Sequence, residues 1–118
     1  MESKRQLKVG ETIKRNFSIV LQQEGPYIYG MDVLVSVTMV NMSPDLGIAK
    51  IYLSIFNTIN KQEVMIMLEE SMHGLRQQLY HRIRKHLRRM PAIQFYIDDT
   101  LDEMDKLNHL FNKMNSKI

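Results

Sequence analysis

The strongest chemical signal in the sequence is a basic segment between His73 and Met90. It contains three histidines and no aspartate or glutamate. Its six cationic residues are Arg76, Arg82, Arg84, Lys85, Arg88 and Arg89. Guanidinium groups bind phosphate oxygens through paired hydrogen bonds, and structured RNA is recognised largely through its backbone and shape. We therefore expect this segment to contact RNA. The alternative is a solvated basic helix that faces acids elsewhere in the chain, such as Asp98, Asp99, Asp102 and Glu103.

A second basic group lies near the start of the chain, where only Glu2 and Glu11 oppose it. Its members are Lys4, Arg5, Lys8, Lys14 and Arg15. Lys50, on the outward side of a predicted strand, completes the candidate RNA-binding set. Such a group is as often a merely solvated face as a binding site. Whether the two groups form one surface depends on the fold.

Catalytic and metal-binding patterns are weak. The acids from Asp98 to Asp105 lack the glycine and ligand spacing of a calcium loop, and acids are favoured at a helix start. The four histidines match no metal or triad motif, and Ser43 and Ser71 lack the surroundings of a nucleophile. A metal-dependent nuclease would need converging carboxylates in a recognised spacing. We expect no catalytic residue, metal or cofactor.

Length and composition fit one soluble domain. The chain has 118 residues, of which 44% are apolar and 25% charged, with a net charge of +3. We expect a single domain over 1–118, with a core at about 4–114 and a frayed end at 115–118. Cysteine is absent, which excludes disulfides, thiolate nucleophiles and Cys-ligated metals. No apolar run approaches a membrane span, and the charged start does not resemble a signal peptide, so we expect a cytoplasmic protein.

The first half of the chain predicts a helix and two strands. Apolar residues three or four apart predict a helix over 4–22, which Glu24-Gly25-Pro26 should end. A strand is expected over 31–40, with Val33, Val35, Val37 and Met39 on one face. A second is expected over 49–56, with Ala49, Ile51, Leu53 and Ile55 facing inward and Lys50, Tyr52 and Ser54 outward. The short Ser43-Pro44-Asp45 connection favours antiparallel neighbours.

The second half predicts a long helix, a third strand and a final helix. Asn60 followed by Glu63 is typical of a helix start. The apolar stripe shifts phase near Gly74, so one helix kinked around 71–75 and two helices fit equally well. The basic segment should be helical from about 75 to 90, where Pro91 closes it. A strand at 93–97 and a helix from Thr100 follow. The fold class is thus α+β, in the order α-β-β-α(kinked)-β-α, with a three-stranded sheet covered by helices on one face.

That order is the one found in type II K-homology domains, and several blocks of residues resemble the ribosome-binding factor A family of bacteria. The most specific block is the turn Ser43-Pro44-Asp45-Leu46 followed by Ala49–Ser54. The remaining blocks, in chain order, are Arg5–Arg15, Val37–Met42 leading into that turn, Arg76–Arg84, Met90-Pro91 and Phe95–Asp102.

The resemblance implies a binding factor without covalent chemistry. Family members bind the free 30S small ribosomal subunit, assist its late assembly and the 5′-end processing of 16S rRNA, and matter most in the cold. It implies 30S and 16S rRNA as partners, a monomer, and neither a membrane nor a small-molecule substrate. An Ala-x-Gly helix kink stands in the family where other such domains have a Gly-x-x-G loop. Here the matching place reads Ser71-Met72-His73, or Met72-His73-Gly74 one residue later.

One alternative function belongs to a different class. A small α+β protein-interaction module could bind a protein partner through an exposed sheet edge or a methionine-rich surface. The chain has ten methionines. Met39, Met72 and Met104 fall on apolar stripes, however, and core filling explains them better.

Overall fold

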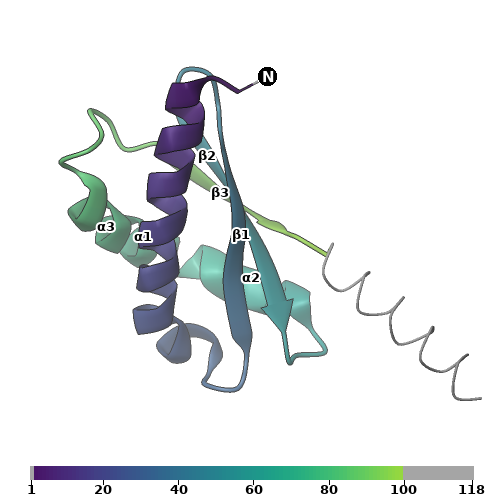
Figure 1. The fold of residues 1–118 in the computed structure, drawn as a ribbon. Coiled ribbons are helices and arrows are strands. Elements are labelled where there is room, and N and C mark those ends of the chain that lie inside the picture. Colours follow the sequence, from purple (N-terminus) through teal and green to yellow (C-terminus); the bar gives the residue numbers. More distant parts are fainter. Residues whose placement is uncertain (1, 100–118) are drawn as a thin grey trace, which may run out of the picture.

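The computed structural model describes residues 2–99. Their elements are α1 (Lys4–Tyr29), β1 (Leu34–Met42), β2 (Ile48–Phe56), α2 (Lys61–Glu70), α3 (Met72–Ile83) and β3 (Ala92–Ile97), shown in Figure 1. This order confirms the predicted one as far as β3. The helix expected from Thr100 and the frayed end at 115–118 lie outside the described residues.

The three strands form one mixed sheet in the order β1-β2-β3. The short turn after β1 makes β1 and β2 antiparallel, and the helical crossover through α2 and α3 makes β3 parallel to β2. The three helices pack on the same side of this sheet (Figure 1). The expected α+β architecture is therefore confirmed.

The core lies between the sheet and the helices, and it is built from the predicted stripes. Phe17 of α1 packs on Phe95 of β3, with ring centroids 5.6 Å apart. The fully buried residues of this core also include Ile13, Ala49, Ile51, Leu53, Leu68, Leu79 and Ile83. Burying each Leu or Ile side chain contributes roughly 1.5–3 kcal/mol. These contacts fix the sites on α1 and α3 relative to the sheet.

The end predicted for the first helix is wrong, because α1 continues through Pro26 to Tyr29. A proline disfavours helical backbone in the residue before it, partly through a clash with that residue's Cβ. Gly25 has no Cβ, so this part of the clash is absent. Ile28 and Tyr29 pack against the core and favour the extra turn. Gly30, with a φ of 92°, then ends the helix.

The predicted face of β1 is correct only as far as Val37. The pairing with β2 shifts between Val37 and Met39, so Thr38 is an extra residue in the strand. A bulge of this kind reverses the alternation beyond it. Met39 is consequently 46% exposed and does not fill the core, while Met42 turns inward and is buried. Ser54, expected to face outward, is buried as well.

The basic segment is helical only in its first half. A break at Ser71 separates α2 from α3, which settles the choice in favour of two helices. α3 then ends at Ile83, so the helix expected to continue to about residue 90 is wrong in that part. The chain must return to the sheet by Ala92, whose backbone N–H donates to the Gly47 carbonyl at 2.8 Å. Residues 84–91 make that return as a loop.

Candidate nucleic-acid interface

The fold brings the two basic groups together along one groove. Two adjoining hollows lie between the first turns of α1 and the loop 84–91, and both are lined by Arg5, Val9, His86 and Leu87. Their volumes are about 300 and 360 Å³. Lys8 and Thr12 complete the first hollow, and Asp45, Leu46, Arg88 and Arg89 complete the second. We call this surface the basic groove, with Arg5, Lys8, Arg88 and Arg89 as its cations.

The start of α1 is anchored beside the end of β1. Ser3 and Gln6 form a reciprocal cap: the Gln6 backbone N–H donates to Ser3 Oγ at 3.2 Å, and the Ser3 N–H donates to Gln6 Oε1 at 2.7 Å. The buried Gln6 amide also donates to the Met42 carbonyl at 3.0 Å. Arg5, next to Gln6, is thereby held at the groove while its own side chain stays exposed.

The turn motif Ser43-Pro44-Asp45-Leu46 forms one end of the groove. Asp45 Oδ1 accepts hydrogen bonds from the Ser43 hydroxyl at 2.7 Å and from the Gly47 N–H at 3.0 Å. These two bonds, together with the smaller effect of the nearby Arg89 charge, lower the pKa of the Asp45 carboxyl. Leu46 adopts a positive φ of 61° within this turn. The main role of the Asp45 carboxylate is therefore to stabilise the turn through these two hydrogen bonds.

Arg89 crosses over the turn at Gly47. A Cβ at position 47 would lie 3.2 Å from the Arg89 guanidinium nitrogen Nη2. The absence of a side chain there lets the guanidinium approach the backbone, on the Asp45 side of the groove. Arg5 and Arg89, which lie 84 positions apart in the sequence, thus line the same hollow.

Arg82 bridges α3 to α1 beside the groove. Its Nε donates to Asn16 Oδ1 at 3.2 Å, and Asn16 in turn donates to the carbonyl of Thr12, a lining residue. This polar link joins the two helices close to the first hollow.

The other predicted cations lie elsewhere. Lys14, Arg15, Arg84 and Lys85 do not line the groove, although Arg15, Arg84 and Lys85 are exposed. Arg76 lines a separate hollow on α3. Lys50 is exposed on the outer face of the sheet, opposite the helices.

The acids described near the end of β3 face other partners than the basic loop. Asp99 forms an ion pair with Lys61 of α2 at 3.6 Å, and Asp98 accepts a hydrogen bond from Thr38 at 2.7 Å. Asp102 and Glu103 lie outside the described residues. Within residues 2–99 no three His, Asp or Glu side chains are placed to hold a metal ion. No helix in the same range is long and apolar enough to cross a membrane.

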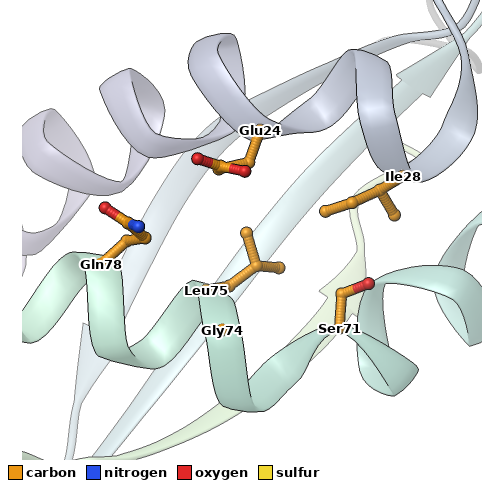
Figure 2. A pocket seen from close by; sticks show the side chains of 6 residues that line it. All are labelled: Glu24, Ile28, Ser71, Gly74, Leu75 and Gln78. Carbon is orange, nitrogen blue, oxygen red and sulfur yellow. The ribbon is translucent and has the colours of Figure 1, made fainter.

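The helix-kink motif lines a pocket near the C-terminal end of α1, away from the basic groove at the start of that helix. Ser71 ends α2 by donating its N–H to the Met67 carbonyl at 3.1 Å, and its own carbonyl accepts from Leu75 at 3.0 Å. The break therefore falls at Ser71, and Gly74 lies within α3 beyond Met72 and His73. Figure 2 shows the pocket of about 300 Å³ between this junction and the end of α1, with Leu75 and Ile28 facing it and Glu24 across from Gln78.

Comparison with known proteins identifies the family. The family model for ribosome-binding factor A matches residues 5–111. The chain belongs to this family. The ribosome-binding factor A of Cytophaga hutchinsonii is 37% identical to it over 114 residues, which cover 97% of this chain and 85% of the relative.

Two solved structures share the fold of the ribosome-binding factor A family with this chain. The crystal structure of the Thermus thermophilus factor has a TM-score of 0.65 at 20% identity and covers 78% of this chain and 94% of its own. A homology model of the Thermus factor, fitted into a cryo-EM map of a 30S complex, has a TM-score of 0.63 at 22% identity, with 79% and 94% covered. At these identities they establish the fold alone.

Family membership confirms the expected absence of an enzymatic role, because the family consists of ribosome-binding factors. The matched range 5–111 includes the block of residues that most specifically resembles the family. That block contains the turn Ser43–Leu46, which closes the basic groove.

Several residues that shape the groove were not among the sequence candidates. Gln6 carried a detectable signal, because Ser3 and Gln6 have the spacing of a capping box. His86 lies in the basic segment, but from the sequence it is weighed only as a metal ligand or a catalyst. Thr12 and Asn16 carried no signal, since their positions opposite the loop 84–91 and Arg82 arise only from the packing of α1 on α3.

Proposed function

We propose that this chain binds the free 30S small ribosomal subunit and assists its late assembly and the 5′-end processing of 16S rRNA. It acts without covalent catalysis, as a cytoplasmic monomer, and matters most during growth in the cold. The observation that carries the proposal is the basic groove, in which cations from α1 and from the loop 84–91 line one continuous surface.

The groove suits an RNA backbone better than a carboxylate-bearing small molecule. Arg5, Lys8, Arg88 and Arg89 are all exposed, so their charges are available to phosphates. The hollows adjoin and take their cations from two elements, so several phosphates of one backbone can be contacted together. Asp45 is the one acid that lines them, and its hydrogen bonds to Ser43 and Gly47 engage it in the turn.

A binding protein can act on assembly only through differential affinity. If the groove fits one arrangement of immature rRNA better than another, binding shifts the rRNA population toward that arrangement. The fixed geometry supports this mechanism. The Ser3–Gln6 cap, the Asp45 turn and the Arg82–Asn16 bridge hold the surrounding elements in place before RNA arrives. The Thermus factor fitted into a 30S map is consistent with the same partner.

The protein-interaction alternative has one observation in its favour. The outer face of the sheet carries the stacked rings of Tyr52 and Tyr96, 5.4 Å apart, and Met39 is exposed. Lys50 lies on this face as well. A protein partner there would leave the basic groove free for RNA, so the two roles are separable by mutation.

The test is co-sedimentation with free 30S particles. Substituting both groove arginines, Arg88→Ala with Arg89→Ala, should weaken binding at least tenfold, because two phosphate contacts are lost. The matched control is Lys14→Ala with Arg15→Ala, which removes the same charge outside the groove and should change binding little. Equal losses in the two double variants would refute the groove as the docking site.

A further inference from the structure

A further hollow with RNA-binding chemistry lies on α3, apart from the two hollows of the basic groove. It measures about 320 Å³ and is lined by His73, Arg76, Gln77, Tyr80 and Met90. We call it the Tyr80 notch. The first four residues have the spacing i, i+3, i+4 and i+7, so they share one helix face. Met90 comes from the loop 84–91 and closes the notch.

The lining combines an accessible aromatic ring with polar groups and no acid. Tyr80 is 45% exposed, and its ring makes a tilted contact with that of His81, centroid to centroid 6.1 Å. Arg76 supplies a guanidinium, Gln77 an amide that both donates and accepts, and Met90 a polarisable apolar edge. The volume is at the low end for a ligand site, roughly 300–1,000 Å³, which suits a single planar group.

We propose that the Tyr80 notch binds one unstacked base of single-stranded RNA. The base stacks on the Tyr80 ring with Met90 at its edge, Gln77 hydrogen-bonds its polar edge, and Arg76 binds the adjoining phosphate. Stacking on aromatic side chains is how proteins recognise splayed-out bases with little dependence on sequence. This assignment rests on the proposed RNA-binding function and adds to it the recognition of an unpaired nucleotide.

The loop 84–91 connects the notch to the basic groove. Arg88 and Arg89 line the groove, and Met90, the next residue, lines the notch. One RNA molecule can therefore be held by its backbone in the groove while a neighbouring base enters the notch. A carboxylate-rich peptide could pair with Arg76, but it would leave the Tyr80 face unused.

The chain contains no tryptophan, so a Tyr80→Trp variant gives a single fluorescent reporter in the notch. We expect its emission to be quenched when a short single-stranded oligoadenylate binds, and to change little when a duplex RNA of the same length binds. The matched control is Tyr27→Trp, at a tyrosine that is 87% exposed near the end of α1, which should show no quenching.

Affinity gives the second readout. Tyr80→Phe keeps the ring and should bind the oligoadenylate like the wild type, whereas Tyr80→Leu should bind it about tenfold more weakly. Both variants should bind the duplex equally, because the groove cations are intact. Tyr80 is half-exposed, and unchanged circular dichroism would show that both variants fold.

The outcomes separate this proposal from the proposed function. The notch alone would be overturned by the following combination of results. The Arg88/Arg89 double variant loses oligoadenylate binding, the Tyr80→Leu variant binds oligoadenylate like the wild type, and the emission of Tyr80→Trp is not quenched. Quenching of Tyr80→Trp by RNase-treated subunits and not by RNA would assign the notch to a protein and overturn it too. A wild-type chain that binds neither RNA nor 30S particles would overturn both.

Discussion

Asp45 shows how one exposed residue can shape a binding surface without belonging to its chemistry. Its carboxylate gathers the Ser43 hydroxyl and the Gly47 N–H, and these two bonds bend the chain sharply between β1 and β2. The same carboxylate lies near Arg89, whose charge adds a smaller effect to the lowering of the Asp45 pKa. The presence of Asp45 in the basic groove is therefore consistent with RNA binding, because its carboxylate accepts hydrogen bonds from Ser43 and Gly47 of its own turn.

The stability that Asp45 provides should depend on pH in a defined direction. Hydrogen bonds from Ser43 and Gly47 lower its pKa below the ordinary 3.8, so its stabilising effect is complete above that value. The effect is lost as the pH falls through the lower, folded-state pKa. The free energy of unfolding of the wild type should thus exceed that of Asp45→Asn at neutral pH, and the gap should close below pH 3.8. Urea titrations across pH measure it, with Asp32→Asn as the control. A gap that widened in acid would contradict this role.

At the scale of elements, the sequence predicted correctly the helices and strands that depend on local residue spacing. It failed at the helix ends that depend on contacts with residues distant in the chain. The stripes of α1, β2 and α3 follow from spacing, and the Asn60 cap is observed, with its side chain accepting from Glu63 at 3.1 Å. The continuation of α1 past Pro26 depends on contacts of Ile28 and Tyr29 with a core that no local window contains. The early end of α3 is likewise imposed by the position of β3.

Gly10 and Gly74 offer a matched test of helix packing. A Cβ at Gly10 would lie 2.9 Å from the Val40 carbonyl oxygen, so α1 and β1 touch through this glycine. Gly10→Ala should therefore destabilise the fold, by roughly 1–3 kcal/mol, despite the better helix propensity of alanine. A Cβ at Gly74 would meet nothing within 4 Å, so Gly74→Ala should raise stability by up to about 1 kcal/mol. Urea unfolding measures both, and equal signs for the two variants would disprove the close contact.

At the scale of the whole molecule, the modest net charge of +3 conceals a local concentration of cations, because Arg5, Lys8, Arg88 and Arg89 line two adjoining hollows. The prediction that the basic residues bind RNA stays a prediction; what the sequence could not show is which cations meet. Arg5 and Arg89 are 84 positions apart and line one hollow, whereas Lys14 and Arg15 on the same helix as Arg5 lie outside it. Tertiary packing makes this selection, since it sets which face of α1 adjoins the loop 84–91.

The salt dependence of RNA binding should show how many of the basic residues contact phosphates. Each neutralised phosphate contributes a slope of about −0.7 to −0.9 to log K against log salt concentration, so the four groove cations predict a slope of about −3 to −4. Participation of all sixteen Lys and Arg residues would give a slope several times steeper. Removing Arg88 and Arg89 together should lower the magnitude of the slope by about 1.5–2, while the Lys14/Arg15 double variant should leave it unchanged. Filter binding of a structured RNA over a salt series measures all three slopes. A steeper wild-type slope that falls equally in both double variants would mean that charge is sensed diffusely over the molecule, and not through the groove.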